Sequence, residues 1–455
     1  MKTYQDLLAL GDREAERIEF AFALVREHKG TAEYKTAEAA VEYDRRKNTT
    51  IMNYRKLLYD LSGKAIPDNY SANYKLPSGF FPRFVTQLNQ YLLGNGMTLK
   101  DTKNKEKLGN GFDTKLQQIG RNALVQGVCF GFWNLDHIEV FKFTEFAPLY
   151  DEETGALMAG VRFWQLAADK PLRITLYEPD GFTEYIESES ERMVRREKTP
   201  YVRLTSTTPA DGEEIVGGMN YPGFPIIPLW GNPNHQSELV GLRESIDCYD
   251  LIKSGFANDL DEATSVYWLI TNAGGMDAKD VANFIRQLKT LHGASVDGDS
   301  GVDVTAHTTQ VPHEARKVYL EQLKADMYED FQVVNVANLS AAAKTATEIN
   351  AAYEPMNNKA DQFEYCVLEF LDALFAIVGI DEEPTFTRSR IVNQTEETQM
   401  VISASEYLDA EAVLKKLPWL TQEEADEILR RRDADELSRA GLVTNPQQNP
   451  EGGEE

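Results

Sequence analysis

The sequence has few cysteines and no long hydrophobic run. Its three cysteines, Cys129, Cys248 and Cys366, lie far apart and form no CxxC pair. This spacing argues against a disulfide scaffold or a zinc finger, and predicts buried thiols in a reducing compartment. The longest uncharged run, residues 215–237, contains four prolines and cannot form a spanning helix. The N-terminal residues lack the apolar core of a signal peptide, so no membrane association is expected.

Positive charge is also scarce. Lys and Arg total 47 against 73 Asp and Glu, which gives a formal net charge of −26. Tight binding of nucleic acid needs a basic footprint, so this composition argues against it. The apolar fraction of 42% and the aromatic fraction of 10% exclude a wholly disordered acidic chain. At 455 residues the chain is too long for one core and predicts two or more subdomains.

Sequence signatures of catalysis are missing. The sequence has no GxxxxGK[ST] phosphate loop, no HExxH and no GxSxG. We therefore expect no catalytic residue, no metal and no cofactor, and not an enzyme. The acidic cluster Asp259, Asp261 and Glu262 leaves one alternative open, a metal-dependent nuclease that holds Mg²⁺. The competing interpretation of that cluster is a charged helix face.

Hydrophobic periodicity divides the chain into helical ends and a β-rich middle. Apolar residues at helical spacing and short aromatic or β-branched runs between turn residues mark the two classes of element. The segment at 345–379 carries Pro355, which predicts a kink. Helices are expected at 4–28, 31–61, 80–93, 112–127, 236–262, 313–333, 345–379 and 395–440, antiparallel strands between 128 and 230, and a small α/β insert between 265 and 312.

Four blocks of sequence occur in an order that resembles one family. They are EAAVEYDRRKNTTIMNYRK (38–56), a block ending in YLLG (73–99), FAPLYDEETGALMAGVRFW (146–164), and a Pro-hydrophobic strand leading into a long helix (226–270). In this order they resemble the portal proteins of tailed bacteriophages, in the branch typified by the Bacillus phage portals. The similarity runs over about 38–380, and no single block is a catalytic signature.

The resemblance implies an α+β portal-type protomer. It would have a wing of helices plus antiparallel β, a two-helix stem, a small α/β clip, a long kinked helix and a helical crown. The expected boundaries are a wing at 1–235 together with 345–394 (the kinked helix and the following strand), stem helices at 236–264 and 313–333, a clip at 265–312, a tunnel loop at 334–344, a crown at 395–440 and a disordered tail at 441–455.

The resemblance also implies a function and partners. Such proteins form a ring, usually a dodecamer, at one capsid vertex, and double-stranded genomic DNA is packaged and ejected through its channel. Implied partners are the terminase large subunit, the head-tail connector or adaptor, and the scaffold and major capsid proteins. The protein would be a virion component assembled in the host cytoplasm. The main alternative is another oligomeric virion protein, such as an adaptor, which would not need a helix–insert–helix stalk.

Two sets of residues are candidates for contact with the DNA channel. In the tunnel loop these are Asn338, Ser340 and Lys344, although Lys344 could equally pair with Glu348 on the next helix. Acids near the end of the first stem helix would repel phosphates if they lined the channel, or would form salt bridges between neighbouring subunits. The charge candidates are Asp250, Lys253, Asp259, Asp261 and Glu262.

Overall fold

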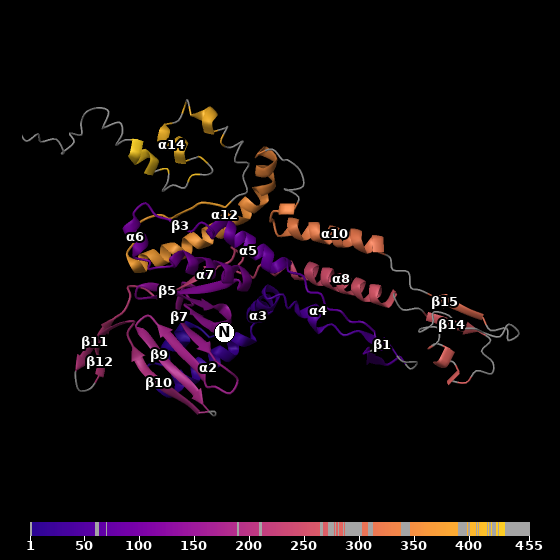
Figure 1. The fold of residues 1–455 in the computed structure, drawn as a ribbon. Helices are drawn as coiled ribbons and strands as arrows, with labels where there is room; N and C mark the ends of the chain where they lie inside the picture. Colours follow the sequence, from indigo (N-terminus) through magenta and orange to yellow (C-terminus); the bar gives the residue numbers. More distant parts are fainter. Residues whose placement is uncertain are drawn as a thin grey trace, which may run out of the picture. The chain divides into compact units, whose positions relative to one another are not determined.

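The structure is a computed structural model of the full chain (Figure 1). Two compact units divide it, one formed by Met1–Gln332 and Ala360–Thr387, the other by Val333–Lys359 and Arg388–Glu455. The described residues are 2–59, 63–69, 71–188, 191–208, 212–263, 267–271, 277, 279–280, 282–284, 286, 303–307, 313–337, 346–389, 398, 401–405, 407, 409–415, 417, 420, 425 and 427–432.

The first unit combines helices with antiparallel sheets, which confirms a mixed helix and antiparallel-sheet fold. Its helices are α1 (Tyr4–Leu8), α2 (Glu14–Gly30), α3 (Ala32–Asp44), α4 (Thr49–Asn53), α5 (Phe80–Leu93), α6 (Thr102–Glu106), α7 (Phe112–Gln126), α8 (Arg243–Ala263), α10 (His313–Asp330) and the C-terminal part of α12 (Ala346–Val378). A single 3-10 turn, η1, spans Phe143–Glu145.

A five-stranded sheet forms one layer of the first unit. Its order is β10-β9-β8-β7-β6, with every neighbouring pair antiparallel. Helix α2 covers one face, where Phe22, Leu24 and Val25 pack with Leu149 and Val161 in a buried cluster. The strands are β6 (Phe146–Tyr150), β7 (Leu157–Trp164), β8 (Leu172–Glu178), β9 (Gly181–Ser188) and β10 (Glu191–Thr199).

A three-stranded antiparallel sheet of order β13-β4-β5 forms the second layer. Aromatic residues on it, among them Phe130, Phe132 and Phe141, form a second buried cluster. Position 131 favours glycine, because a Cβ there would lie 2.7 Å from the ring of Phe370 on α12. The strands are β4 (Val128–Asn134), β5 (His137–Lys142) and β13 (Ile226–Trp230).

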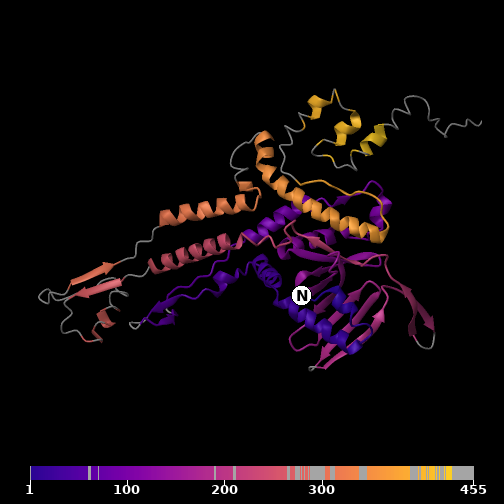
Figure 2. The same ribbon diagram turned by 180° about the vertical axis from the view of Figure 1, so that it is seen from behind.

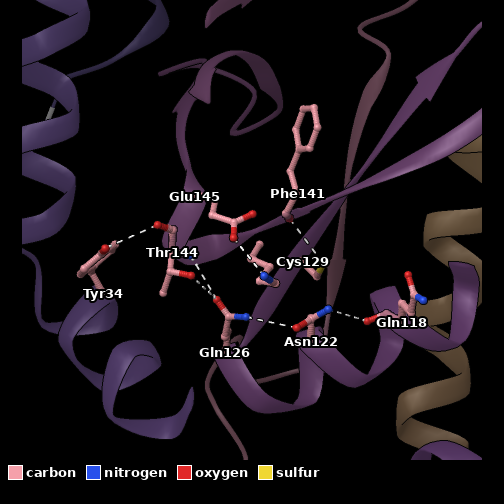
Figure 3. Close-up of polar contacts among 9 residues, drawn as sticks. Tyr34, Gln118, Asn122, Gln126, Cys129, Phe141, Thr144 and Glu145 are labelled. Atoms are coloured by element: carbon pink, nitrogen blue, oxygen red, sulfur yellow. Dashed lines mark hydrogen bonds and ion pairs between the residues drawn. The ribbon is translucent and has the colours of Figure 1, made fainter. Parts of the chain in front are cut away.

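Polar contacts join the end of α7 to the turn η1, which follows β5 (Figure 3). The side-chain oxygen of Gln126 accepts hydrogen bonds from the backbone N–H and the hydroxyl of Thr144, both at 3.1 Å, and its Nε2 donates to Asn122 at 3.4 Å. The thiol of Cys129 donates to the Phe141 carbonyl at 3.4 Å. Burial raises the pKa of this thiol, so Cys129 is a structural group rather than a nucleophile.

Short ribbons complete the first unit. All of them are two-stranded, and β16 with β3 joins residues nearly three hundred positions apart. They are β1 (Leu57–Tyr59) with β2 (Ala65–Pro67), β11 (Val202–Thr208) with β12 (Gly212–Met219), β14 (Tyr267–Thr271) with β15 (Asp303–His307), and β16 (Thr385–Phe386) with β3 (Met97–Thr98). In the second unit the described elements are the N-terminal part of α12 and α14 (Ala410–Lys415).

Several expected elements are confirmed. Helices at 80–93 and 112–127 match α5 and α7 within one residue, and 313–333 contains α10. The region 128–230 is antiparallel β, as its aromatic and β-branched runs predicted. Helix α12 carries Pro355 inside it.

Three helix predictions were wrong in extent. The helix expected over 4–28 is divided into α1 and α2, because Gly11 adopts φ +55° between them. The helix expected over 31–61 ends at Asp44, and the chain continues into the short α4 and then the β1–β2 hairpin. The helix expected from 236 begins at Arg243, after turns at 238–242.

Candidate functional site

Helices α8 and α10 lie side by side as an antiparallel pair (Figures 1 and 2). Asp259 near the end of α8 forms an ion pair with Arg316 near the start of α10, which fixes the antiparallel register. Strand β14 follows α8 and pairs with β15, which precedes α10, from Tyr267↔His307 to Thr271↔Asp303. In the described residues, the antiparallel helix pair is therefore accompanied by an antiparallel ribbon, and the assignment of these elements to a stem and a clip stays a prediction.

Aromatic contacts hold the base of the α8–α10 pair on α5. Phe80 lies edge-on to Tyr249 of α8 with ring centroids 5.0 Å apart. One turn later, Phe84 lies edge-on to Tyr328 of α10 at 4.8 Å. Because i and i+4 share one face of a helix, a single face of α5 contacts both helices.

A ladder of hydrogen bonds ties an extended segment, residues 73–78, along α8. The backbone N–H groups of Tyr74, Leu76 and Ser78 donate to three α8 side chains. Their acceptors are Asn258 Oδ1 at 2.7 Å, Ser254 Oγ at 3.1 Å and Asp250 Oδ1 at 2.8 Å. Two extended residues advance about 6.7 Å, and four helical residues advance about 6 Å, so the spacings match.

The sequence of this segment suits the ladder. Pro77 restricts the residue before it to extended conformations, which keeps Leu76 out of a helix. Proline has no backbone N–H to donate, but Pro77 lies between the two donors Leu76 and Ser78, at a position where the ladder uses no N–H group. On α8 the three acceptors occur every fourth residue and are all less than 10% exposed. They therefore form one buried polar stripe.

Asp250 is the most enclosed member of that stripe, with none of its surface exposed. Besides the bond from Ser78, its carboxylate accepts a hydrogen bond from Asn48 Nδ2, which also donates to the Ser78 carbonyl at 3.2 Å. Burial raises the pKa of Asp250, whereas the hydrogen bonds from Asn48 and Ser78 and the charge of Lys253 lower it. Desolvation is the largest of these effects.

A second carboxylate on α8 ties the same helix to α3 and α4. Asp247 accepts hydrogen bonds from the Tyr43 hydroxyl and from Thr50 Oγ1, the latter at 2.6 Å. The Nε atom of Arg243 lies 3.7 Å from the Asp247 carboxylate. The start of α8 is therefore held by charge-assisted hydrogen bonds in addition to apolar packing.

The charge candidates from the sequence occupy different environments. Asp250 is buried and hydrogen-bonded inside the protomer, so its carboxylate is not exposed at the surface of this chain. Asp259 forms an ion pair with Arg316 of the same chain. Lys253 is half-buried, and Asp261 is exposed. Glu262 lies in α8, and its side chain is outside the described residues.

The tunnel-loop candidates lie outside the described residues. Asn338, Ser340 and Lys344 all fall in the interval 338–345, between residues 336–337 and the start of α12. Their expected contact with DNA therefore remains a prediction from the sequence.

The described part of the chain offers no catalytic constellation. Among these residues no group of three or more His, Cys, Asp or Glu side chains could hold a metal ion. A cavity of about 360 Å³ between β7, β13 and α12 is lined by apolar residues such as Leu157, Phe224 and Ile377, and none of its lining side chains can titrate. No described helix combines the length and hydropathy that crossing a bilayer requires.

The ladder and the residues that form it were not predicted from the sequence. Asn48, Ser254 and Asn258 each carry no charge and match no motif, so nothing singled them out. A signal was present, because Asp250, Ser254 and Asn258 repeat every fourth residue in a helix whose other stripe is apolar. In this helix the polar stripe faces a hydrogen-bonding partner, whereas a stripe of that period more often faces solvent.

Comparison with known proteins gives a consistent result. A family model described as "Phage portal protein, SPP1 Gp6-like" matches residues 27–436. The portal protein of Clostridium phage phiCD119 is 24% identical over 226 residues, which cover 48% of this chain and 50% of that protein. The portal protein of Bacillus phage SPP1 is 22% identical over 384 residues, covering 76% of this chain and 73% of that protein. The chain thus spans about half the length of the first of these relatives.

A solved structure also shows weak similarity. It is titled "Neck of empty GTA particle computed with C6 symmetry" and is 11% identical in sequence. The superposition has a TM-score of 0.43 and covers 74% of this chain and 90% of the other.

Proposed function

Since the chain belongs to the phage portal protein family of the SPP1 Gp6-like type, we propose that it forms a ring-shaped channel at one capsid vertex. Genomic DNA is packaged and ejected through this channel. The family match over residues 27–436 carries the proposal. The hairpin of α8, β14, β15 and α10 supports it, because an adaptor of ordinary size needs no such projecting element.

We assign the elements to the regions expected of a portal protomer. The sheets and helices of 1–235, with 345–394, form the wing. Helices α8 and α10 are the stem, and the β14–β15 ribbon belongs to the clip. Residues 334–344 are the tunnel loop, and 395–440 the crown. The terminase large subunit docks on the clip during packaging, and the head-tail connector docks there afterwards.

The path of the DNA needs a surface that does not hold phosphates. The chain is acidic overall, with a formal charge of −26, so a ring of copies repels the duplex and allows it to slide. On α8, Asp261 is exposed and supplies such a charge, whereas Asp250 does not. The tunnel loop, with Asn338, Ser340 and Lys344, contacts the duplex more closely. ATP hydrolysis belongs to the terminase.

Assembly places the protein in the virion. The ring forms in the host cytoplasm with the scaffold and major capsid proteins, and one ring occupies one vertex. Its subunit number is expected to be twelve. This number makes the proposal measurable, because a dodecamer has twelve times the 51.3 kDa mass of one chain.

Negative-stain electron microscopy of the purified protein, with light scattering for mass, tests the proposal. The expected result is rings with a central hole and a mass close to twelve chains. The control is the same protein in mild denaturant, where rings should dissociate to single chains. A homogeneous monomer that forms no ring, even when capsid scaffold protein is added, would contradict a portal function.

A further inference from the structure

Exposed hydrophobic side chains are concentrated in one short stretch of the first unit. Of the 23 large hydrophobic residues that are exposed among the described residues, eight lie between positions 52 and 76. Tyr59 is 71% exposed, and every residue of β1 and β2 is exposed. We call residues 52–78 the arm. The eight are Met52, Tyr54, Leu57, Leu58, Tyr59, Ile66, Tyr74 and Leu76.

The arm also reverses the charge of the chain. Between residues 52 and 78 the sequence has four Lys or Arg and two Asp, a formal charge of +2, whereas the whole chain has a net charge of −26. Arg55 and Lys64 are exposed at the two ends of the hairpin. The arm is therefore a basic and apolar surface in an acidic protein. Such a combination suits a partner that is both acidic and apolar.

A surface with the complementary character lies on the α8–α10 pair. These two helices contain eleven acids against five Lys or Arg. On α10, Glu314, Val318 and Glu321 are exposed and recur at helical spacing, so they share one face. Leu260 on α8 is also exposed. Acidic and apolar groups thus alternate along this pair of helices.

Hydrogen bonds to α8 of the same chain restrict how far the arm can fold back to bury its own exposed residues. The ladder from Tyr74, Leu76 and Ser78 fixes its C-terminal end on the buried stripe of α8. Fixing this end limits the orientations that the arm can adopt, which lowers the entropy lost on binding. A second molecule must cover this face if it is to be buried.

We propose that the arm is an intersubunit clasp, which binds the α8–α10 pair of the neighbouring copy of this chain. A closed ring with head-to-tail contacts needs two different complementary surfaces on each protomer, and this chain carries both. The inference rests on the proposed ring. A duplex is a poorer occupant of the arm, because the exposed leucines and tyrosines gain little from sugar and phosphate.

Replacing apolar residues of the arm by acids tests the clasp. The variant is Leu57→Glu with Tyr59→Glu, and the matched control is Leu166→Glu with Met193→Glu, two exposed residues of the wing. We expect the arm variant to need at least about tenfold more protein for half-assembly in light scattering, as loss of interface anchors predicts. The control should assemble as the wild type does. Equal assembly of both variants overturns the clasp.

Charge exchange and cross-linking locate the partner surface. Arg55→Glu with Lys64→Glu should weaken assembly, and adding Glu314→Lys with Glu321→Lys should restore it, which a folding defect would not allow. Tyr59→Cys should form disulfides between copies with Val318→Cys or Leu260→Cys on oxidation. Absence of both cross-links in assembled rings overturns the clasp but leaves the portal function intact. Failure of the wild type to form any ring contradicts both proposals.

Discussion

Replacing Asp250 by alanine removes the most buried rung of the ladder between residues 73–78 and α8. The substitution leaves the N–H of Ser78 and one N–H of Asn48 without their acceptor. Each buried donor left unsatisfied costs about 1–3 kcal/mol. Relief of the buried charge offsets part of this loss. We therefore expect the free energy of unfolding to fall by about 2–4 kcal/mol.

Hydrogen exchange measured by mass spectrometry gives the sharpest assay of this change. In Asp250→Ala, amides in a peptide covering 71–80 should exchange faster, with the effect strongest at Ser78. The matched control is Asp261→Ala, an exposed acid on the same helix, which should leave that peptide protected. Unchanged protection in Asp250→Ala would refute the ladder as the contact that holds this segment.

Asp250 also predicts a pH dependence. Burial raises its pKa in the folded chain, whereas the unfolded chain returns it to about 3.9. The stability from this group is then fully present below the unfolded pKa and is lost as pH rises through the folded pKa. The stability advantage of wild type over Asp250→Asn should therefore shrink as the pH rises above about 4. Urea titrations of both proteins measure it, and an advantage that grows with pH contradicts the raised pKa.

Three further changes have defined outcomes. Gly131→Ala places a Cβ 2.7 Å from the Phe370 ring. It should lower the free energy of unfolding, measured by urea titration, by about 1–3 kcal/mol. In Gly255→Ala on α8 the new Cβ meets no atom within 4 Å. This substitution should raise the free energy of unfolding by about 0.5–1 kcal/mol. Burial lowers the pKa of His28, whose Nε2–H donates to the Phe143 carbonyl at 2.9 Å. The contribution of neutral His28 to folding stability should therefore be present above about pH 6.5 and be lost as the pH falls below it. Thermal melts at pH 5 and pH 7 measure this, and His28→Gln should remove the loss of stability at pH 5.

The elements that were predictable from sequence are those whose own residues repeat at one period. Helix α5 is an example, because Phe80, Phe84 and Leu88 recur every fourth residue and all become buried. Helix α7 ends where Gly127 adopts φ +90°, a conformation that glycine favours. In both cases the local pattern and the tertiary packing agree, so the sequence alone was sufficient.

The β1–β2 hairpin could not be predicted in the same way. Every residue of its strands is exposed, so no alternation of apolar and polar residues marks a buried face. Its neighbour, the segment 73–78, forms hydrogen bonds to side chains about 180 positions away. Contacts between distant segments decide such structures, and no local pattern records them.

Cysteine burial was partly predictable. Buried thiols were predicted for all three cysteines; Cys129 and Cys366 are buried, and burial raises the pKa of Cys366 to about 11. Cys248 is only half-buried, because it lies on α8, a helix that packs on its neighbours along some faces and not others. Helical position, rather than residue type, decided that difference.

The charge that α8 can present to DNA follows from its contacts and not from its composition. The helix has six acids and two bases, a formal charge of −4. Among the acids whose side chains are described, Asp247 and Asp250 accept hydrogen bonds from neighbouring elements, and Asp259 is paired with an arginine. Only Glu244 and Asp261 among these are exposed. A channel lined by this helix would thus repel phosphate far less than its sequence implies.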